Sequence, residues 1–163
     1  MKKHLKRLML GLIAGLSMAG TSYAATTIAN FQVRMTIQAD CRIVSASDLN
    51  FGTNGVISAN VEVNSSLNVQ CTNLTPYTIG LNAGTGSGAT VAARLMTLSG
   101  ATIQYSLYSD AARTTVWGDA AANWVAATGN GASQLYSIFG RVPPQTTPVP
   151  GLYTDTVTVT VTF

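Results

Sequence analysis

Residues 31–39, FQVRMTIQA, alternate apolar and polar side chains over their whole length. The apolar positions are Phe31, Val33, Met35, Ile37 and Ala39. A period of two indicates a β-strand with one apolar and one polar face, about 30 Å long at ~3.3 Å per residue. A strand this close to the start of a chain either pairs within its own sheet or fills a groove in a neighbouring molecule.

The first 24 residues have the pattern of a secretory signal peptide. Basic residues within positions 2–7 precede an apolar run over residues 8–19, and small residues follow, which predicts cleavage after Ala24. A retained membrane anchor is the alternative, but the run is shorter than the ~20 residues that span a bilayer. We therefore predict an exported chain with no stable membrane insertion.

Removing the signal peptide changes the charge of the chain. The mature part keeps five arginines against six acidic residues, which gives a net charge of −1, and it contains neither lysine nor histidine. Nucleic-acid binding needs a basic surface, which this composition excludes. Catalysis needs a poised acid, base or nucleophile, so we expect no enzyme activity, no cofactor and no metal site.

Cys41 and Cys71 are the two cysteines of the chain. In an exported protein an even pair indicates a disulfide, which would stabilise the fold by about 3–4 kcal/mol for a loop of this length. Two buried free thiols are the alternative. The wide spacing, with no histidine nearby, argues against a zinc site.

The mature chain contains many short alternating stretches separated by Gly, Pro and Asn turns. We expect strands over residues 40–44, 48–52, 67–72, 76–82, 94–98, 102–109, 134–142 and 153–163, and a further short strand could form over residues 116–118. In the last of these, Val157, Val159, Val161 and Phe163 alternate with threonines. Residues 119–130 lack a clear period and are expected to be mainly loop. Many short strands without an amphipathic helix predict a single all-β sandwich.

Other polar and aromatic residues fit structural roles best. Asp110 with Arg113 is expected to cap a turn or form an ion pair, and Asp155 is expected to pair with Arg141. Aromatic side chains at strand spacing are expected in the core, although they could instead line a sugar-binding surface: Tyr105, Tyr108, Trp117, Trp124 and Tyr136.

Five segments together resemble the spore coat protein U domain family. They are SLNVQCT at 66–72, PYTIGLNAG at 76–84, YSLYSDAAR at 105–113, FGRVP at 139–143 and GLYTD at 151–155. They follow in order and with similar spacing over nearly the whole mature chain. The family includes subunits of archaic (sigma-type) chaperone–usher pili of Gram-negative bacteria.

The resemblance implies an incomplete immunoglobulin-like β-sandwich that lacks its last strand. Residues 25–40 would be an N-terminal donor-strand extension, residues 41–163 the pilin domain, and Cys41 and Cys71 match the family's disulfide positions. The implied donor-strand residues are Phe31, Val33, Met35, Ile37 and Ala39. The implied edge of the acceptor groove consists of Val157, Val159, Val161 and Phe163.

The resemblance also implies how such a subunit works. A periplasmic chaperone would fill the gap first, and the extension of the next pilus subunit would replace it at an outer-membrane usher. The subunit would pass through the periplasm to the cell surface and serve in adhesion or biofilm formation. A secreted coat or carbohydrate-binding domain that completes its own sandwich is the alternative.

Overall fold

The computed structural model describes residue 20 and residues 22–163. The predicted signal peptide, residues 1–24, therefore lies almost entirely outside the described residues. The chain divides into residues 1–35 and residues 36–163, and each part is described by itself. All regular structure in the described residues is β-strand, and no helix among them is long and apolar enough to cross a membrane.

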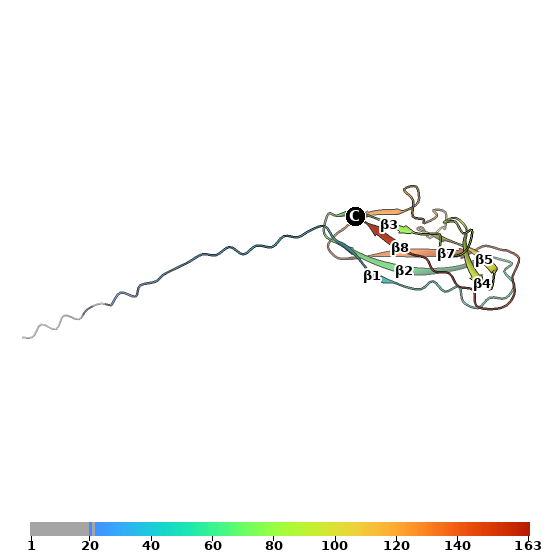
Figure 1. Cartoon of the computed structure of the whole chain (residues 1–163), viewed down its shortest axis with the longest axis horizontal. Helices are drawn as coiled ribbons and strands as arrows, with labels where there is room; N and C mark the ends of the chain where they lie inside the picture. Colours follow the sequence, from blue (N-terminus) through green and yellow to red (C-terminus); the bar gives the residue numbers. More distant parts are fainter. Residues whose placement is uncertain (1–19, 21) are drawn as a thin grey trace, which may run out of the picture. The chain divides into compact units, whose positions relative to one another are not determined.

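Residues 36–163 form two antiparallel sheets arranged as a sandwich, which confirms the predicted all-β class (Figure 1). The larger sheet has the order β1 (Cys41–Ala46), β2 (Val61–Cys71), β7 (Ser133–Val142), β5 (Ala101–Tyr108) and β4 (Arg94–Leu98). The smaller sheet has the order β6 (Val125–Thr128), β3 (Pro76–Leu81) and β8 (Val159–Thr162).

The core lies between the sheets and is built from alternate residues of the central strands. In β2, Leu67, Val69 and Cys71 are buried, whereas the residues between them are half-buried. In β3, Ile79 and Leu81 face the core and are buried as well. Each fully buried aliphatic side chain contributes about 1.5–3 kcal/mol, so these two strands anchor the sandwich.

Arg94, at the start of β4, is fully buried and joins loops from both sheets. Its guanidinium donates hydrogen bonds of 2.7–2.9 Å to the carbonyl oxygens of Leu81, Asn82, Val91 and Trp117. Burial lowers the pKa of Arg94, because the apolar surroundings penalise its charge. The four carbonyl groups offset that penalty and fix the end of β3 against the neighbouring loops.

Cys41 and Cys71 form a disulfide, as predicted, and no free cysteine remains among the described residues. The two residues are directly paired across β1 and β2, with their Cα atoms 4.1 Å apart. The bond therefore fastens the first strand, which follows the extension, to the core strand β2.

Replacing Cys41 and Cys71 together with serine is expected to lower the free energy of unfolding by about 3–4 kcal/mol, because the bond closes a long loop. Denaturant unfolding of the mature subunit and of the double variant measures the difference. Reduction of the unmodified subunit is the matched control and should lower the midpoint similarly. Equal midpoints in all three samples would contradict this role of the disulfide.

Several stretches differ from the strands expected from the sequence. The strand expected over residues 67–72 begins six residues earlier, at Val61. Residues 48–52 and 153–158 contain no strand, so the last strand is confined to Val159–Thr162. Conversely, Val125–Thr128 forms β6 within the region expected to be loop, because it pairs with β3. Pairing with a neighbour decides strand formation more than the local pattern does, and both strandless stretches border an open groove.

Candidate functional site

An apolar groove with a volume of about 1050 Å³ opens between the two sheets. Its walls are the irregular segments 46–57 and 147–157, and core side chains form its floor. Typical small-molecule pockets enclose ~300–1,000 Å³, so this groove has the capacity for an extended peptide segment.

Apolar side chains from both sides dominate the groove. Leu49 and Phe51 contribute from one wall, Ile103 from β5 and Val159 from β8, and all of them are only partly buried. Phe51 packs edge to face against Tyr105, with the ring centroids 6.1 Å apart. Water therefore reaches core side chains that a complete sandwich would cover, and such a surface indicates a binding site.

β8 forms one side of the groove and is an edge strand. It pairs with β3 from Leu81–Val159 to Thr78–Thr162, and among the described strands none pairs with its other side. An unpaired edge offers a row of main-chain N–H and C=O groups to an incoming strand. The groove thus combines an apolar floor with a free strand edge.

Asp155 fixes the wall that leads into β8. Its carboxylate accepts hydrogen bonds from the main-chain N–H and hydroxyl of Thr85, at 2.7 and 2.8 Å, and from the hydroxyl of Tyr105 at 2.7 Å. Asn82 accepts a further bond of 2.9 Å from the N–H of Thr158. Although partial burial opposes it, the hydrogen bonds from Thr85 and Tyr105 keep the pKa of Asp155 below its usual value. The main chain of the wall is also held to β4 at one position, where Thr154 and Thr97 exchange hydrogen bonds of 2.9 and 3.2 Å.

The predicted pairing of Asp155 with Arg141 is wrong. Arg141 lies on β7 opposite Glu62 of β2 and binds that carboxylate at 2.8 Å, while Arg113 binds its other oxygen at 3.0 Å. Asp110 caps its turn as predicted, because it accepts hydrogen bonds from main-chain N–H groups four and five residues later. Arg113 and Arg141 therefore both bind Glu62, and neither lines the groove.

The predicted core aromatics are mostly covered. Tyr105 and Trp117 are buried, Tyr108 and Tyr136 are half-buried, and Trp124 is 41% exposed. Trp117 donates its indole N–H to the carbonyl oxygen of Ile79 in β3 at 2.9 Å. The polar atom of this buried side chain is therefore paired. Among the described residues, no group of three or more His, Cys, Asp or Glu side chains could hold a metal ion.

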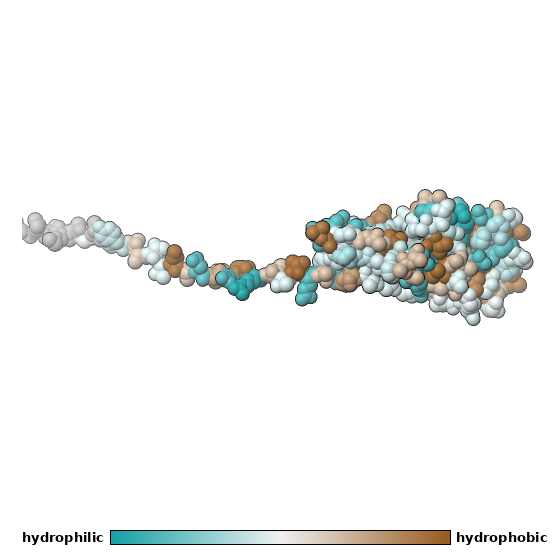
Figure 2. Space-filling view, turned by 90° about the horizontal axis from the view of Figure 1, so that it is seen from above, coloured by the Kyte–Doolittle hydropathy of each residue, from teal (hydrophilic) through white to brown (hydrophobic). Residues whose placement is uncertain are grey.

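The N-terminal extension carries the alternating apolar residues without covering them. Residues 22–35 have no regular secondary structure, and Phe31, Val33 and Met35 are 88%, 85% and 87% exposed. Brown apolar and teal polar residues succeed one another along this segment (Figure 2). In the second part of the chain, Ile37 continues the pattern and is 71% exposed. The alternating apolar side chains of the extension are thus exposed.

The predicted acceptor-edge residues fall into three positions. Val157 and Val159 line the groove, Val161 packs half-buried against the core, and Phe163 follows β8 and is 56% exposed. The sequence pattern missed the wall formed by residues 147–152, where no element was expected. It signalled the opposite wall through the alternating residues of 48–52, although these form no strand.

Comparisons with known proteins agree with this fold. A chain in the crystal structure of the CsuC–CsuE chaperone–tip adhesion subunit pre-assembly complex, from archaic chaperone–usher Csu pili of Acinetobacter baumannii, matches 78% of this chain. The match has a TM-score of 0.57 and 29% sequence identity. Because it covers 40% of that solved chain, the present chain spans less than half of its length.

The sequence matches to known proteins also include part of the N-terminal extension. Protein U of Myxococcus xanthus is 33% identical over 155 residues, which cover 86% of this chain and 87% of that protein. The Spore Coat Protein U domain matches residues 27–160, from within the extension to β8. The chain belongs to the Spore Coat Protein U domain family.

Proposed function

We propose that this protein is a secreted structural subunit of a chaperone–usher pilus that polymerises by donor-strand exchange. In this exchange, the extension of one subunit enters the groove of another and pairs with the free edge of β8. The observation that carries the proposal is the open apolar groove beside that edge. Family membership and the likeness to a chain from a chaperone–usher pilus complex support it.

The extension and the groove match in chemistry. Phe31, Val33, Met35 and Ile37 lie on one side of an extended strand and would enter the apolar groove together. The polar residues between them would face solvent on the outer side of the strand. Pairing with β8 would add main-chain hydrogen bonds along the strand, as in other cases of strand addition.

The energy available from this docking is large for a protein of this size. Burying the four apolar side chains at ~1.5–3 kcal/mol each gives at most ~6–12 kcal/mol. Whole domains are stable by only ~5–15 kcal/mol, so an empty groove leaves a subunit short of much of its stability. A donated strand would accordingly be held strongly.

The same exposed groove explains why partners are needed before assembly. An apolar surface left open in the periplasm favours aggregation, so we propose that a periplasmic chaperone covers it first. An outer-membrane usher then exchanges the chaperone for the next subunit, and the fibre serves adhesion or biofilm formation at the cell surface. The proposed role requires no catalytic residue and no cofactor.

Polymerisation of the purified mature subunit tests the proposal. We expect a ladder of SDS-resistant bands on unboiled gels that collapses to a single band on boiling, because strand docking is strong but not covalent. The measurement uses oxidised subunit, so that reduction of the disulfide does not contribute. A strict monomer under all conditions would instead support a coat or carbohydrate-binding domain that completes its own sandwich.

A further inference from the structure

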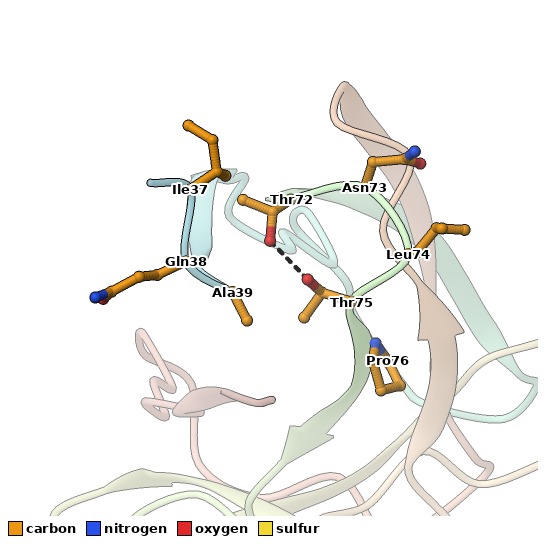
Figure 3. A pocket seen from close by; sticks show the side chains of 8 residues that line it. All are labelled: Ile37, Gln38, Ala39, Thr72, Asn73, Leu74, Thr75 and Pro76. Atoms are coloured by element: carbon orange, nitrogen blue, oxygen red, sulfur yellow. Dashed lines mark hydrogen bonds between the residues drawn. The ribbon is translucent and has the colours of Figure 1, made fainter. Parts of the chain in front are cut away.

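The turn of residues 72–75, between β2 and β3, presents a large apolar side chain to solvent. Leu74 is 77% exposed and has a φ of +63°, a conformation that residues other than glycine seldom adopt. The turn is nevertheless well held: Leu74 donates its N–H to the carbonyl of Gly129 at 2.8 Å, and the hydroxyls of Thr72 and Thr75 lie 2.6 Å apart (Figure 3). An unusual backbone that is firmly supported points to a role for the side chain it displays.

The start of the domain is clamped to this turn. Asp40 donates its N–H to the hydroxyl of Thr72 at 3.1 Å, and its carbonyl accepts the N–H of Thr72 at 2.9 Å. The disulfide follows immediately at Cys41. A shallow pocket of about 320 Å³ lies beside the clamp, lined by residues 37–39 and 72–76 (Figure 3). The point from which the donor strand would leave is therefore fixed in space.

The clamp limits the distance between two linked subunits. If the proposed donor strand is docked through Ile37, only Gln38 and Ala39 connect it to the fixed Asp40. The three Cα–Cα intervals from Ile37 to Asp40 cover at most about 10 Å in an extended chain. The turn of residues 72–75 must then lie directly against the surface of the subunit that accepts the strand.

The direction of the strands identifies which surface that is. β2 runs from Val61 to Cys71, so the end of the sandwich at Val61 lies opposite the clamp (Figure 1). We call it the groove end, because the walls 52–57 and 147–152 are joined there. Ile57 donates its N–H to the hydroxyl of Thr147 at 2.8 Å and accepts a bond from Gln145 at 3.1 Å. The groove extends from this end toward the middle of the sandwich.

The groove end carries its own exposed apolar side chains. Val56, Val149 and Leu152 are 82%, 62% and 78% exposed, and all three line the mouth of the groove. A donor strand with Ile37 at this mouth runs antiparallel to β8, which heads toward the clamped end of the sandwich. That orientation brings Leu74 of the donor subunit to the exposed residues of the acceptor.

We propose that Leu74 of one subunit docks against Val56, Val149 and Leu152 of a second copy of this chain, and so forms a contact separate from the donor strand. The proposal rests on the proposed function. The contact buries side chains that a lone subunit leaves in water, and it fixes the angle between neighbouring subunits. It converts a flexible string of domains into a fibre of defined shape.

Cysteine cross-linking tests this contact in the full mature subunit. Leu74→Cys combined with Leu152→Cys, or with Val149→Cys, is expected to give a ladder that survives boiling without reductant and disappears with it. The matched control combines Leu74→Cys with Leu135→Cys, which lies on the outer face of β7 and is 65% exposed. The control should form the ordinary ladder that collapses on boiling.

The outcomes separate this contact from strand exchange. A normal unboiled ladder without any cross-link would overturn the contact and leave the exchange intact, whereas unmodified subunits that never polymerise would overturn both. Should the cysteine variants fail to assemble, Leu74→Gly provides a second test, because glycine accepts the positive φ and keeps the turn. We expect Leu74→Gly fibres with an unchanged melting temperature of the subunit but a wider spread of inter-subunit angles in electron micrographs. An unchanged spread would overturn the contact.

Discussion

A mature subunit without residues 25–39 is expected to fold and to bind a supplied donor peptide, but not to attach itself to a second subunit. The groove is formed by residues 46–159, so the deletion leaves it intact. Asp40 and its two hydrogen bonds to Thr72 also remain. The lost segment is the one whose apolar side chains stand exposed in the isolated chain.

Unboiled gels of purified subunits measure this result. The deleted subunit should run as a monomer, and adding a peptide of residues 31–39 should raise its melting temperature, because the peptide fills the groove. When the deleted subunit is mixed with intact subunits, it should terminate the growing polymers, since it accepts a donor strand but donates none. If the deleted subunit forms fibres alone, residues 31–39 belong to their own sheet and the donor-strand proposal fails.

Point variants test whether assembly depends on the apolar side chains of residues 31–39 or only on the presence of the segment. Val33→Asp with Met35→Asp should abolish the ladder as the deletion does, because two carboxylates would enter an apolar groove. Gln32→Ser, on the outer face of the same strand, is the matched control and should be nearly silent. Moving the apolar residues by one position should also fail, since it turns every side chain to the wrong face.

The sequence patterns predicted the paired strands well and the groove walls poorly. Leu67, Val69 and Cys71 alternate in the sequence and belong to the buried core, and β2, which carries them, is paired with a strand on each side. Residues 153–158 alternate just as clearly but contain no strand, because their pairing with a neighbouring strand is limited to an isolated bridge between Thr154 and Thr97 of β4. The local sequence pattern predicts which face of a segment is apolar. Whether the segment forms a strand also depends on a neighbouring strand with which it can pair.

The candidate site shows the same division. The period placed Val157 and Val159 on one face, the family resemblance implied that this face borders a groove, and both residues line the open groove. The wall of residues 147–152 could not be predicted, because an irregular segment with prolines has no period from which a facing side can be read. Likewise β6 forms in an Ala- and Asn-rich stretch because β3 supplies its partner, and nothing in its own residues indicates that pairing.

Val159→Asp is expected to weaken binding of the donor strand by about 100-fold or more. Val159 pairs with Leu81 at the start of β8 and lines the groove. An aspartate there either places an unpaired charge among apolar side chains or becomes protonated, at a cost of several kcal/mol. A loss of about 3 kcal/mol corresponds to a loss of about 100-fold in affinity.

Titration of the peptide of residues 31–39 into subunits lacking their own extension gives the affinity directly. Thr160→Asp is the matched control, because Thr160 is the next residue of β8, faces away from the groove and is exposed. It should bind the peptide almost normally, since its carboxylate stays in water. In the periplasm, the Val159 variant should also accumulate less, because its groove suits neither chaperone nor donor strand. Normal yield together with normal peptide binding would show that the strand docks elsewhere and that β8 does not border the acceptor groove.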